Sequence, residues 1–133
     1  MSLENRQAIS KVRFEKAEEC LADAKLLLER ESYKSAANRS YYAVFHAMRA
    51  VLAYDGYDSK KHSGIIAEFR RLYIKTGVFE SSMSDTIRSL FDLRTDSDYN
   101  DFFVASKADV AAQVENAEHF VARVKEYLTT LQK

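Results

Sequence analysis

The chain has 133 residues, contains no proline and has only three glycines. This length suits one domain with a single hydrophobic core, and the scarcity of helix-breaking residues favours long helices. Basic and acidic residues number 20 each, so no net charge attracts the chain to nucleic acid or to an anionic membrane, and any nucleic-acid contact must come from a local patch. A single cysteine, Cys20, excludes an internal disulfide. Without a secretory signal or a long apolar run, we expect a soluble cytoplasmic protein that makes no membrane contact.

Apolar residues at helical spacing predict five helices within a single domain over residues 1–133. Steps of three and four residues predict a first helix at about 6–30 and a last helix at about 106–131. Between them, helices are expected at about 32–54, 61–75 and 82–93, followed by a non-helical acidic stretch at 96–103. We therefore predict an all-α, up-and-down bundle in which two long flanking helices surround a central one.

The segment 36–52, as a helix, would present three different faces. One face is apolar and suits the core. A second face carries only small side chains, so another helix could approach it closely: Ala36, Ser40, Ala43, Ala47 and Ala50. The third face carries a polar row at steps of three, four and three, which lets each side chain reach the next: Arg39, Tyr42, His46 and Arg49. A helix with three such faces is expected to be the centre of the fold.

A second polar group is expected where the fourth helix ends. Arg94 continues the inward-facing stripe of that helix, so its guanidinium requires a partner at the edge of the core. Asp96 or Asp98 could supply that partner. The residues expected to converge with them complete the candidate ligand-binding set: Arg39, Tyr42, His46, His62, Arg94, Asp98 and Tyr99. Within this set, His46, His62 and Tyr99 are the candidates for proton transfer.

Two interpretations of this set remain open. In the structural interpretation, these side chains form a buried hydrogen-bonded network. The physical chemistry of the side chains, taken without any family resemblance, favours this interpretation. In the functional one, arginines bind phosphate and a histidine or tyrosine transfers a proton, as metal-independent RNA cleavage or nucleotide binding requires.

Motifs for metals and common cofactors are missing. Segment 96–107 begins like a calcium loop, but Asp101 stands where glycine is needed and Lys107 where a glutamate is needed. The histidines and Cys20 lack zinc-ligand spacing. No Gly-x-Ser-x-Gly elbow or phosphate-binding glycine loop occurs. The sequence therefore predicts neither a metal site nor a cofactor.

Three segments resemble the HEPN superfamily of small all-helical prokaryotic domains: S-Y-Y-A-V-F-H-A at 40–47, K-H-S-G-I-I at 61–66 and R-T-D-S-D-Y at 94–99. This resemblance covers nearly the whole chain and implies a HEPN-like bundle that forms a homodimer. In HEPN ribonucleases an arginine is followed, after four to six residues, by a histidine, and two copies of this motif meet across the dimer. Arg94 matches the arginine, but the possible histidine positions hold Tyr99, Asn100 and Asp101. The resemblance therefore leaves open whether the protein is an enzyme.

The pattern Arg-x-x-x-Asp-Tyr at 94–99 is similar to a branch of short stand-alone HEPN proteins. Members of that branch are often encoded beside a minimal nucleotidyltransferase, and the pair resembles a toxin–antitoxin module. The function implied is a nucleotide- or RNA-related partner of such an enzyme, with Arg94 and Arg39 as phosphate ligands. In related pairs the partner modifies a tyrosine that would align with Asp101, and Tyr99 is an analogue of it. The alternatives are a non-catalytic binding or scaffolding module and a divergent metal-independent endoribonuclease that uses His46.

Overall fold

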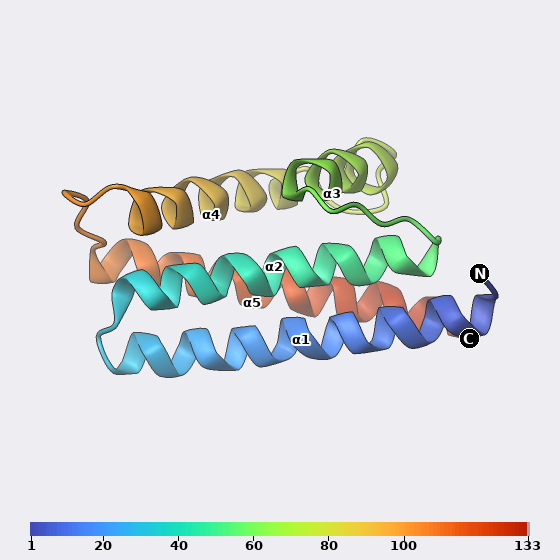
Figure 1. The fold of residues 1–133 in the computed structure, drawn as a ribbon, viewed down its shortest axis with the longest axis horizontal. Helices are drawn as coiled ribbons and strands as arrows, with labels where there is room; N and C mark the ends of the chain where they lie inside the picture. Colours follow the sequence, from blue (N-terminus) through green and yellow to red (C-terminus); the bar gives the residue numbers. More distant parts are fainter. Residues whose placement is uncertain (133) are drawn as a thin grey trace.

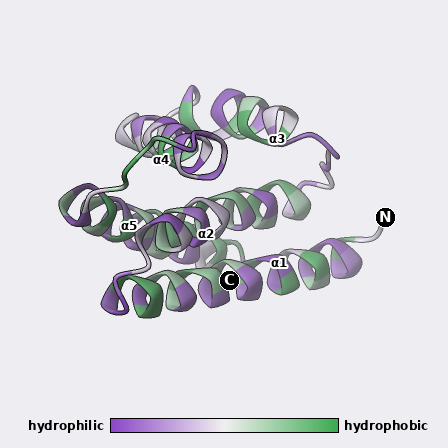
Figure 2. Cartoon of the chain, turned by 60° about the vertical axis from the view of Figure 1, so that its left-hand side comes forward, coloured by the Kyte–Doolittle hydropathy of each residue, from purple (hydrophilic) through white to green (hydrophobic). Residues whose placement is uncertain are grey.

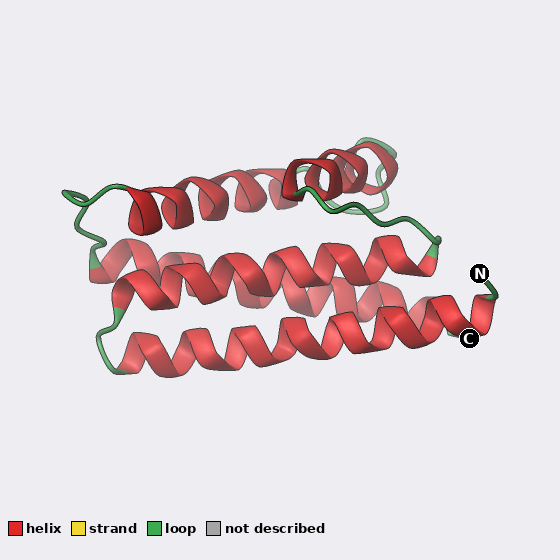
Figure 3. Ribbon diagram, in the orientation of Figure 1, coloured by secondary structure: helices red, strands yellow, loops and turns green. Residues whose placement is uncertain are grey.

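A computed structural model describes residues 1–132, which form helices joined by short connections (Figure 1, Figure 3). The helices are α1 (Leu3–Glu29), α2 (Tyr33–Tyr54), α3 (His62–Phe69), α4 (Ser82–Tyr99) and α5 (Lys107–Leu131). α3 continues directly into a π-helical turn, Arg70–Ile74. No strand occurs among the described residues. The predicted all-α class and the five-helix bundle are therefore confirmed.

α2 is the centre of the bundle. It contacts α1, α3, α4 and α5. Figure 1 shows α1 on one side of α2 and α5, and α3 with α4 on the other side. Hydrophobic and hydrophilic residues alternate around each helix (Figure 2), as expected where one side of a helix is buried and the other exposed. In the described part of the chain, no helix is long and apolar enough to cross a membrane.

The small-residue face of α2 packs against α1. Its four alanines and Ser40 are completely buried. The Ser10 hydroxyl of α1 donates a 2.7 Å hydrogen bond to the Ala50 carbonyl, and Ala24 of α1 shares a buried cluster with Ala36. These contacts fix an antiparallel register between the two helices. The helix predicted to approach this face closely is therefore α1 of the same chain, and the face is closed to a second copy.

α4 is longer than predicted. It extends to Tyr99, so the expected end near residue 93 and the expected non-helical stretch from residue 96 were wrong at this point. No glycine or proline stops the helix, and an ion pair from Arg94 to Asp98, one turn later, stabilises the additional turn. Ser97 is buried there, which ties the turn to the bundle. Between α4 and α5, the non-helical connection therefore runs only from Asn100 to Ser106.

Candidate functional site

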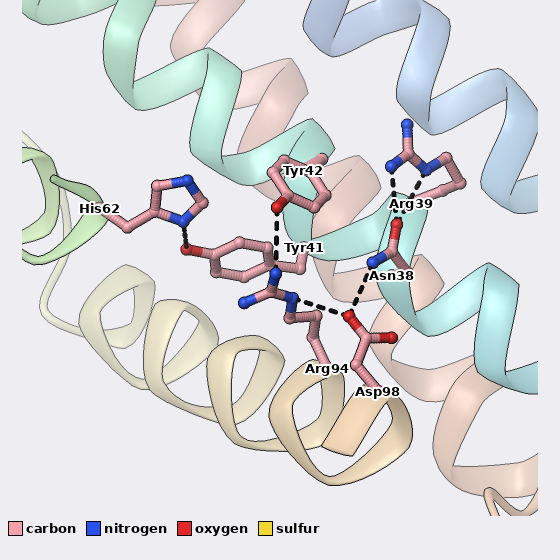
Figure 4. Close-up of polar contacts among 7 residues, drawn as sticks. All are labelled: Asn38, Arg39, Tyr41, Tyr42, His62, Arg94 and Asp98. Atoms are coloured by element: carbon pink, nitrogen blue, oxygen red, sulfur yellow. Dashed lines mark hydrogen bonds and ion pairs between the residues drawn. The ribbon is translucent and has the colours of Figure 1, made fainter. Parts of the chain in front are cut away.

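Arg94 of α4 points toward α2 (Figure 4). Its Nη2 donates a hydrogen bond of 3.1 Å to the Tyr42 hydroxyl, and its Nε lies 3.0 Å from Asp98 Oδ2. The guanidinium carbon is 5.3 Å, 5.4 Å and 5.6 Å from the ring centroids of Tyr41, Tyr42 and Tyr99. Arg94 is therefore held by one carboxylate and three aromatic rings, and its side chain is only 15% exposed.

Asn38 connects this arginine pair to the polar row of α2. Its Nδ2 donates to Asp98 Oδ2 over 3.0 Å, and its Oδ1 accepts from Arg39 Nε and Nη2 over 3.0 Å and 2.7 Å. The Arg39 guanidinium also lies over the Tyr42 ring at 5.1 Å. Within residues 1–132, Arg39 forms no ion pair, because its side-chain partners are the neutral Asn38 and the Cys20 sulfur at 3.9 Å.

His62 at the start of α3 joins the site through Tyr41. Its Nδ1 lies 3.0 Å from the Tyr41 hydroxyl, and its ring stacks on Phe45 with centroids 4.1 Å apart. Burial raises the pKa of Tyr41 to about 12, so the phenol keeps its proton at neutral pH. Burial lowers the pKa of His62, and the nearby Arg94 lowers it further. A protonated phenol next to a neutral imidazole makes Tyr41 the donor and His62 Nδ1 the acceptor.

His46 lies between Tyr42 and Arg49 on the polar row. Its ring centroid is 6.0 Å from that of Tyr42. Burial, followed by the positive charges of Arg49, Lys16 and Arg39, lowers the pKa of His46 to about 4. Its buried Nδ1 has no hydrogen-bond partner among the described residues. At neutral pH, His46 is therefore an uncharged imidazole with one free ring nitrogen in cationic surroundings.

The far end of the row carries more positive charge than negative charge. Arg49 Nη2 lies 3.7 Å from Asp58 Oδ1, and Arg13 Nη2 of α1 lies 3.0 Å from Asp58 Oδ2. One carboxylate thus serves two guanidiniums. The row from Arg39 to Arg49 therefore has a local positive excess, although the whole chain is neutral.

The structure brings the predicted residues into one region on α2, α3 and α4. Direct contacts connect Arg94 with Tyr42, Asp98 and Tyr99. Arg39 joins through Asn38, His62 joins through Tyr41, and His46 lies next to the Tyr42 ring. Tyr99 lies at the rim, with 72% of its surface exposed. The ligand-binding and catalytic roles of these residues remain predictions.

Sequence reasoning missed three contributors to the site. Tyr41 was assigned to the apolar face of α2, although a buried phenol normally needs a hydrogen-bond partner, and that rule is a signal for it. Asn38 and Lys16 gave no signal. Their roles depend on where α4 and α1 lie relative to α2, and helical spacing within one segment does not reveal this.

Comparisons with known proteins support this architecture. The model of the HEPN domain family matches residues 10–127. A UPF0332 protein of Thermotoga maritima is 35% identical over 118 residues, which is 89% of each chain. The protein named "Putative toxin MJ0605" of Methanocaldococcus jannaschii is 34% identical over 112 residues, covering 84% of this chain and 83% of the relative.

A solved structure has the same fold. The crystal structure of TT1696 from Thermus thermophilus matches with a TM-score of 0.74 at 17% sequence identity, over 88% of this chain and 96% of that chain. The matched segment of the family model includes α2, α3 and α4, which carry the polar residues described above. The chain therefore belongs to the HEPN domain family, and its relatives include UPF0332 proteins and proteins named as putative toxins.

Proposed function

We propose that this protein binds the phosphate groups of a nucleotide or an RNA on the polar row of α2, as a member of a toxin–antitoxin pair. Its partner in this proposal is a minimal nucleotidyltransferase. Family membership and the relatives named as toxins support the toxin–antitoxin part. The sequence pattern around Arg94 supports the nucleotidyltransferase part. One observation supports phosphate binding most strongly: within residues 1–132, Arg39 of α2 has no carboxylate partner and Arg49 of α2 shares one carboxylate with Arg13.

This charge excess has three components. Among the described residues, Arg39 has only neutral partners, and Arg49 shares Asp58 with a second arginine. After burial, the charges that lower the pKa of His46 most come from three cationic side chains, Arg49, Lys16 and Arg39. A phosphate bound along the row would offset this repulsion, and the planar fork of a guanidinium binds phosphate oxygens in pairs.

Arg39 is better placed than Arg94 to be the primary phosphate ligand. Arg94 is already neutralised by Asp98 and donates to Tyr42. Its position between the tyrosine rings suits it to orienting Tyr42 and to closing one side of the site. Arg39 would only exchange a neutral amide for an anion, which costs less than breaking an ion pair.

His46 supports a second candidate function, a metal-independent endoribonuclease. A neutral imidazole is the form that accepts a proton from a ribose hydroxyl, and the low pKa of His46 keeps its ring in that form at neutral pH. Arg39 and Arg49 lie on either side of it and would stabilise negative charge that develops on the phosphate. This reaction would use a histidine of α2 in place of the histidine that is absent after Arg94.

Binding of a fluorescently labelled short single-stranded RNA, with AMP and ATP as competitors, tests the proposal. We expect the affinity of the wild type to fall as salt rises, because each phosphate contact releases counterions. Arg39→Ala should weaken binding by about tenfold and reduce the salt dependence by about one phosphate contact. Arg71→Ala is the matched control, since that exposed arginine pairs with Glu68 outside the site.

The same samples distinguish the alternatives. If the wild type binds none of the three ligands, or if Arg71→Ala weakens binding as much as Arg39→Ala does, the proposal is wrong. In the first case the network around Arg94 is purely structural. Cleavage of the RNA by the wild type, lost in His46→Ala, would establish the endoribonuclease instead.

A further inference from the structure

Two arginines from neighbouring helices meet on one carboxylate in the connection between α2 and α3. Arg13 Nη2 of α1 lies 3.0 Å from Asp58 Oδ2, and Arg49 Nη2 of α2 lies 3.7 Å from Asp58 Oδ1. The two arginine side chains are 14% and 24% exposed, whereas that of Asp58 is 56% exposed. Two helices thus hold a pair of largely buried guanidiniums, and the carboxylate between them comes from a segment at the surface. We name Arg13 and Arg49 the arginine pair.

Asp58 satisfies the arginine pair only in part. It carries one negative charge against two positive charges. At 3.7 Å its contact with Arg49 is longer than a hydrogen bond, and Arg49 Nε is buried without a hydrogen-bond partner among the described residues. Burial and the charge of Arg13 lower the pKa of Arg49, because both disfavour its positive charge. The pair can therefore bind an anion that has more charge and more oxygens than a carboxylate.

A third arginine lies against the same connection. A Cβ placed on Gly56 would come within 3.2 Å of Arg6 Cδ, so the Arg6 side chain packs on the backbone two residues before Asp58. Arg6 Nε is also buried without a hydrogen-bond partner within residues 1–132. The other acidic side chain of the connection, Asp55, accepts a hydrogen bond from Tyr73. Positive charge therefore exceeds negative charge around this connection.

We propose that the arginine pair binds the terminal phosphate of a phosphomonoester, and that Asp58 occupies this site until such a ligand displaces it. A phosphomonoester carries about two negative charges near pH 7, which matches two guanidiniums. It has three terminal oxygens, one more than a carboxylate, so it can also accept from the edge of Arg49 that carries Nε. A phosphodiester carries a single charge. The site therefore selects the free phosphate end of a nucleotide or an RNA over a phosphate inside an RNA backbone.

Displacement of Asp58 requires only a local change. The connection is non-helical from residue 55 to residue 61, and the Asp58 side chain is already more than half exposed. Water can solvate the carboxylate once it turns outward. The two arginines stay where α1 and α2 hold them, so the site is ready before the ligand arrives.

This site is distinct from the phosphate site proposed around Arg39. It shares Arg49 with the polar row of α2, but its second ligand is Arg13 of α1. Ten helical residues, about 15 Å, separate Arg39 from Arg49, so a single phosphate cannot contact both. Binding at the arginine pair would therefore stand if binding at Arg39 failed.

Calorimetric titration of the full chain with AMP and with 3′,5′-cyclic AMP tests the proposal, because these ligands differ mainly in the charge of one phosphate. We expect the wild type to bind AMP about tenfold more tightly. Arg13→Gln should remove this preference, because only one guanidinium then faces the phosphate. Arg39→Ala should lower the affinity for both ligands alike and keep the preference, which separates this site from the polar row.

Asp58→Asn gives a result that a folding defect cannot imitate. Removing the internal competitor should strengthen AMP binding about threefold. Asp109→Asn is the matched control, because it removes the same charge from the first turn of α5. That turn lies at the opposite end of the bundle from the connection between α2 and α3 (Figure 1). The control should leave the affinity for AMP unchanged.

A short RNA with and without a 5′-phosphate identifies the source of the phosphate. Tighter binding of the phosphorylated RNA would assign the site to RNA ends. Equal binding of the two RNAs, together with the preference for AMP, would assign it to free nucleotides.

Three results would overturn the proposal. The first is a wild type that binds AMP and cyclic AMP equally, or binds neither. The second is Asp58→Asn with no higher affinity for AMP than Asp109→Asn. The third is a preference for AMP that Arg39→Ala removes and Arg13→Gln keeps, which would place the phosphate at Arg39.

Discussion

The two sides of α2 differ in what their packing permits. Toward α1, the helix presents alanines and one serine, all completely buried, and the polar contact from Ser10 to Ala50 is short and satisfied. On its polar side, it presents tyrosine, histidine and arginine side chains that stay partly exposed. Small residues let two helix backbones approach closely, whereas long polar side chains keep helices apart.

We expect the close-packed side of α2 to serve stability and the polar side to serve binding. The close-packed side has no space for a ligand and no group that titrates near neutral pH. Within the described residues, the polar side has one arginine without a carboxylate partner, Arg39, and an imidazole whose buried Nδ1 has no hydrogen-bond partner. Substitutions on the two sides should therefore have different consequences, large for stability on the first and large for binding on the second.

The largest effect is expected on the close-packed side. Ala47→Glu would place a carboxylate in the completely buried interface between α1 and α2, at a cost of about 3 kcal/mol or more. Urea denaturation measures this loss. Ala112→Glu on the exposed side of α5 is the control and should change little. Equal stability of the two variants would contradict the close packing of this side.

A smaller loss of stability is expected from Arg94→Ala, on the polar side. It removes the ion pair with Asp98 and the hydrogen bond to Tyr42, and should cost about 1–3 kcal/mol. Adding Asp98→Asn should restore part of the loss, because the stranded carboxylate disappears. If the double variant loses at least as much free energy of unfolding as the two single variants together, the two side chains do not act as a pair.

The pH dependence of stability should report on His46. Its pKa of about 4 in the folded protein lies below the ordinary value of 6.5, so the unfolded chain binds more protons between these two pH values. Stability should therefore rise as pH increases from about 4 to about 6.5. For this half-buried ring, we expect a change of about 1 kcal/mol. His46→Gln should flatten the curve.

The smallest effect is expected from Tyr42→Phe. The substitution removes one hydroxyl, which accepts from Arg94, and keeps the ring beneath both guanidiniums. A loss of about 0.5–1 kcal/mol in thermal or urea unfolding would fit a single satisfied hydrogen bond. A loss as large as that of Arg94→Ala would show that the hydroxyl, and not the ion pair, anchors Arg94.

Features that depend on helical periodicity within a segment were predictable from the sequence. The five helices, the central position of α2 and its three faces all follow from spacing within single segments, and the structure confirms them. The last turn of α4 was missed because its acidic residues are typical of a loop. A contact from Arg94 to Asp98 outweighs that composition.

In the candidate site, the part that lies on a single helix was also predictable. The row Arg39, Tyr42, His46 and Arg49 lies on one helix, so its alignment followed from the sequence. Asn38 and Lys16 were not predictable, because they join the site only through the positions of α4 and α1. The low pKa of His46 depends on the same tertiary arrangement.

Titration of the His46 imidazole by NMR, with and without a short single-stranded RNA, tests the central claim most directly. In the free protein, burial and the positive charges of Arg49, Lys16 and Arg39 keep the pKa of this histidine at about 4. If the polar side of α2 binds phosphate, the bound anion offsets those charges, and the pKa of His46 should rise toward its ordinary value. An unchanged pKa at an RNA concentration that saturates any binding would contradict the claim.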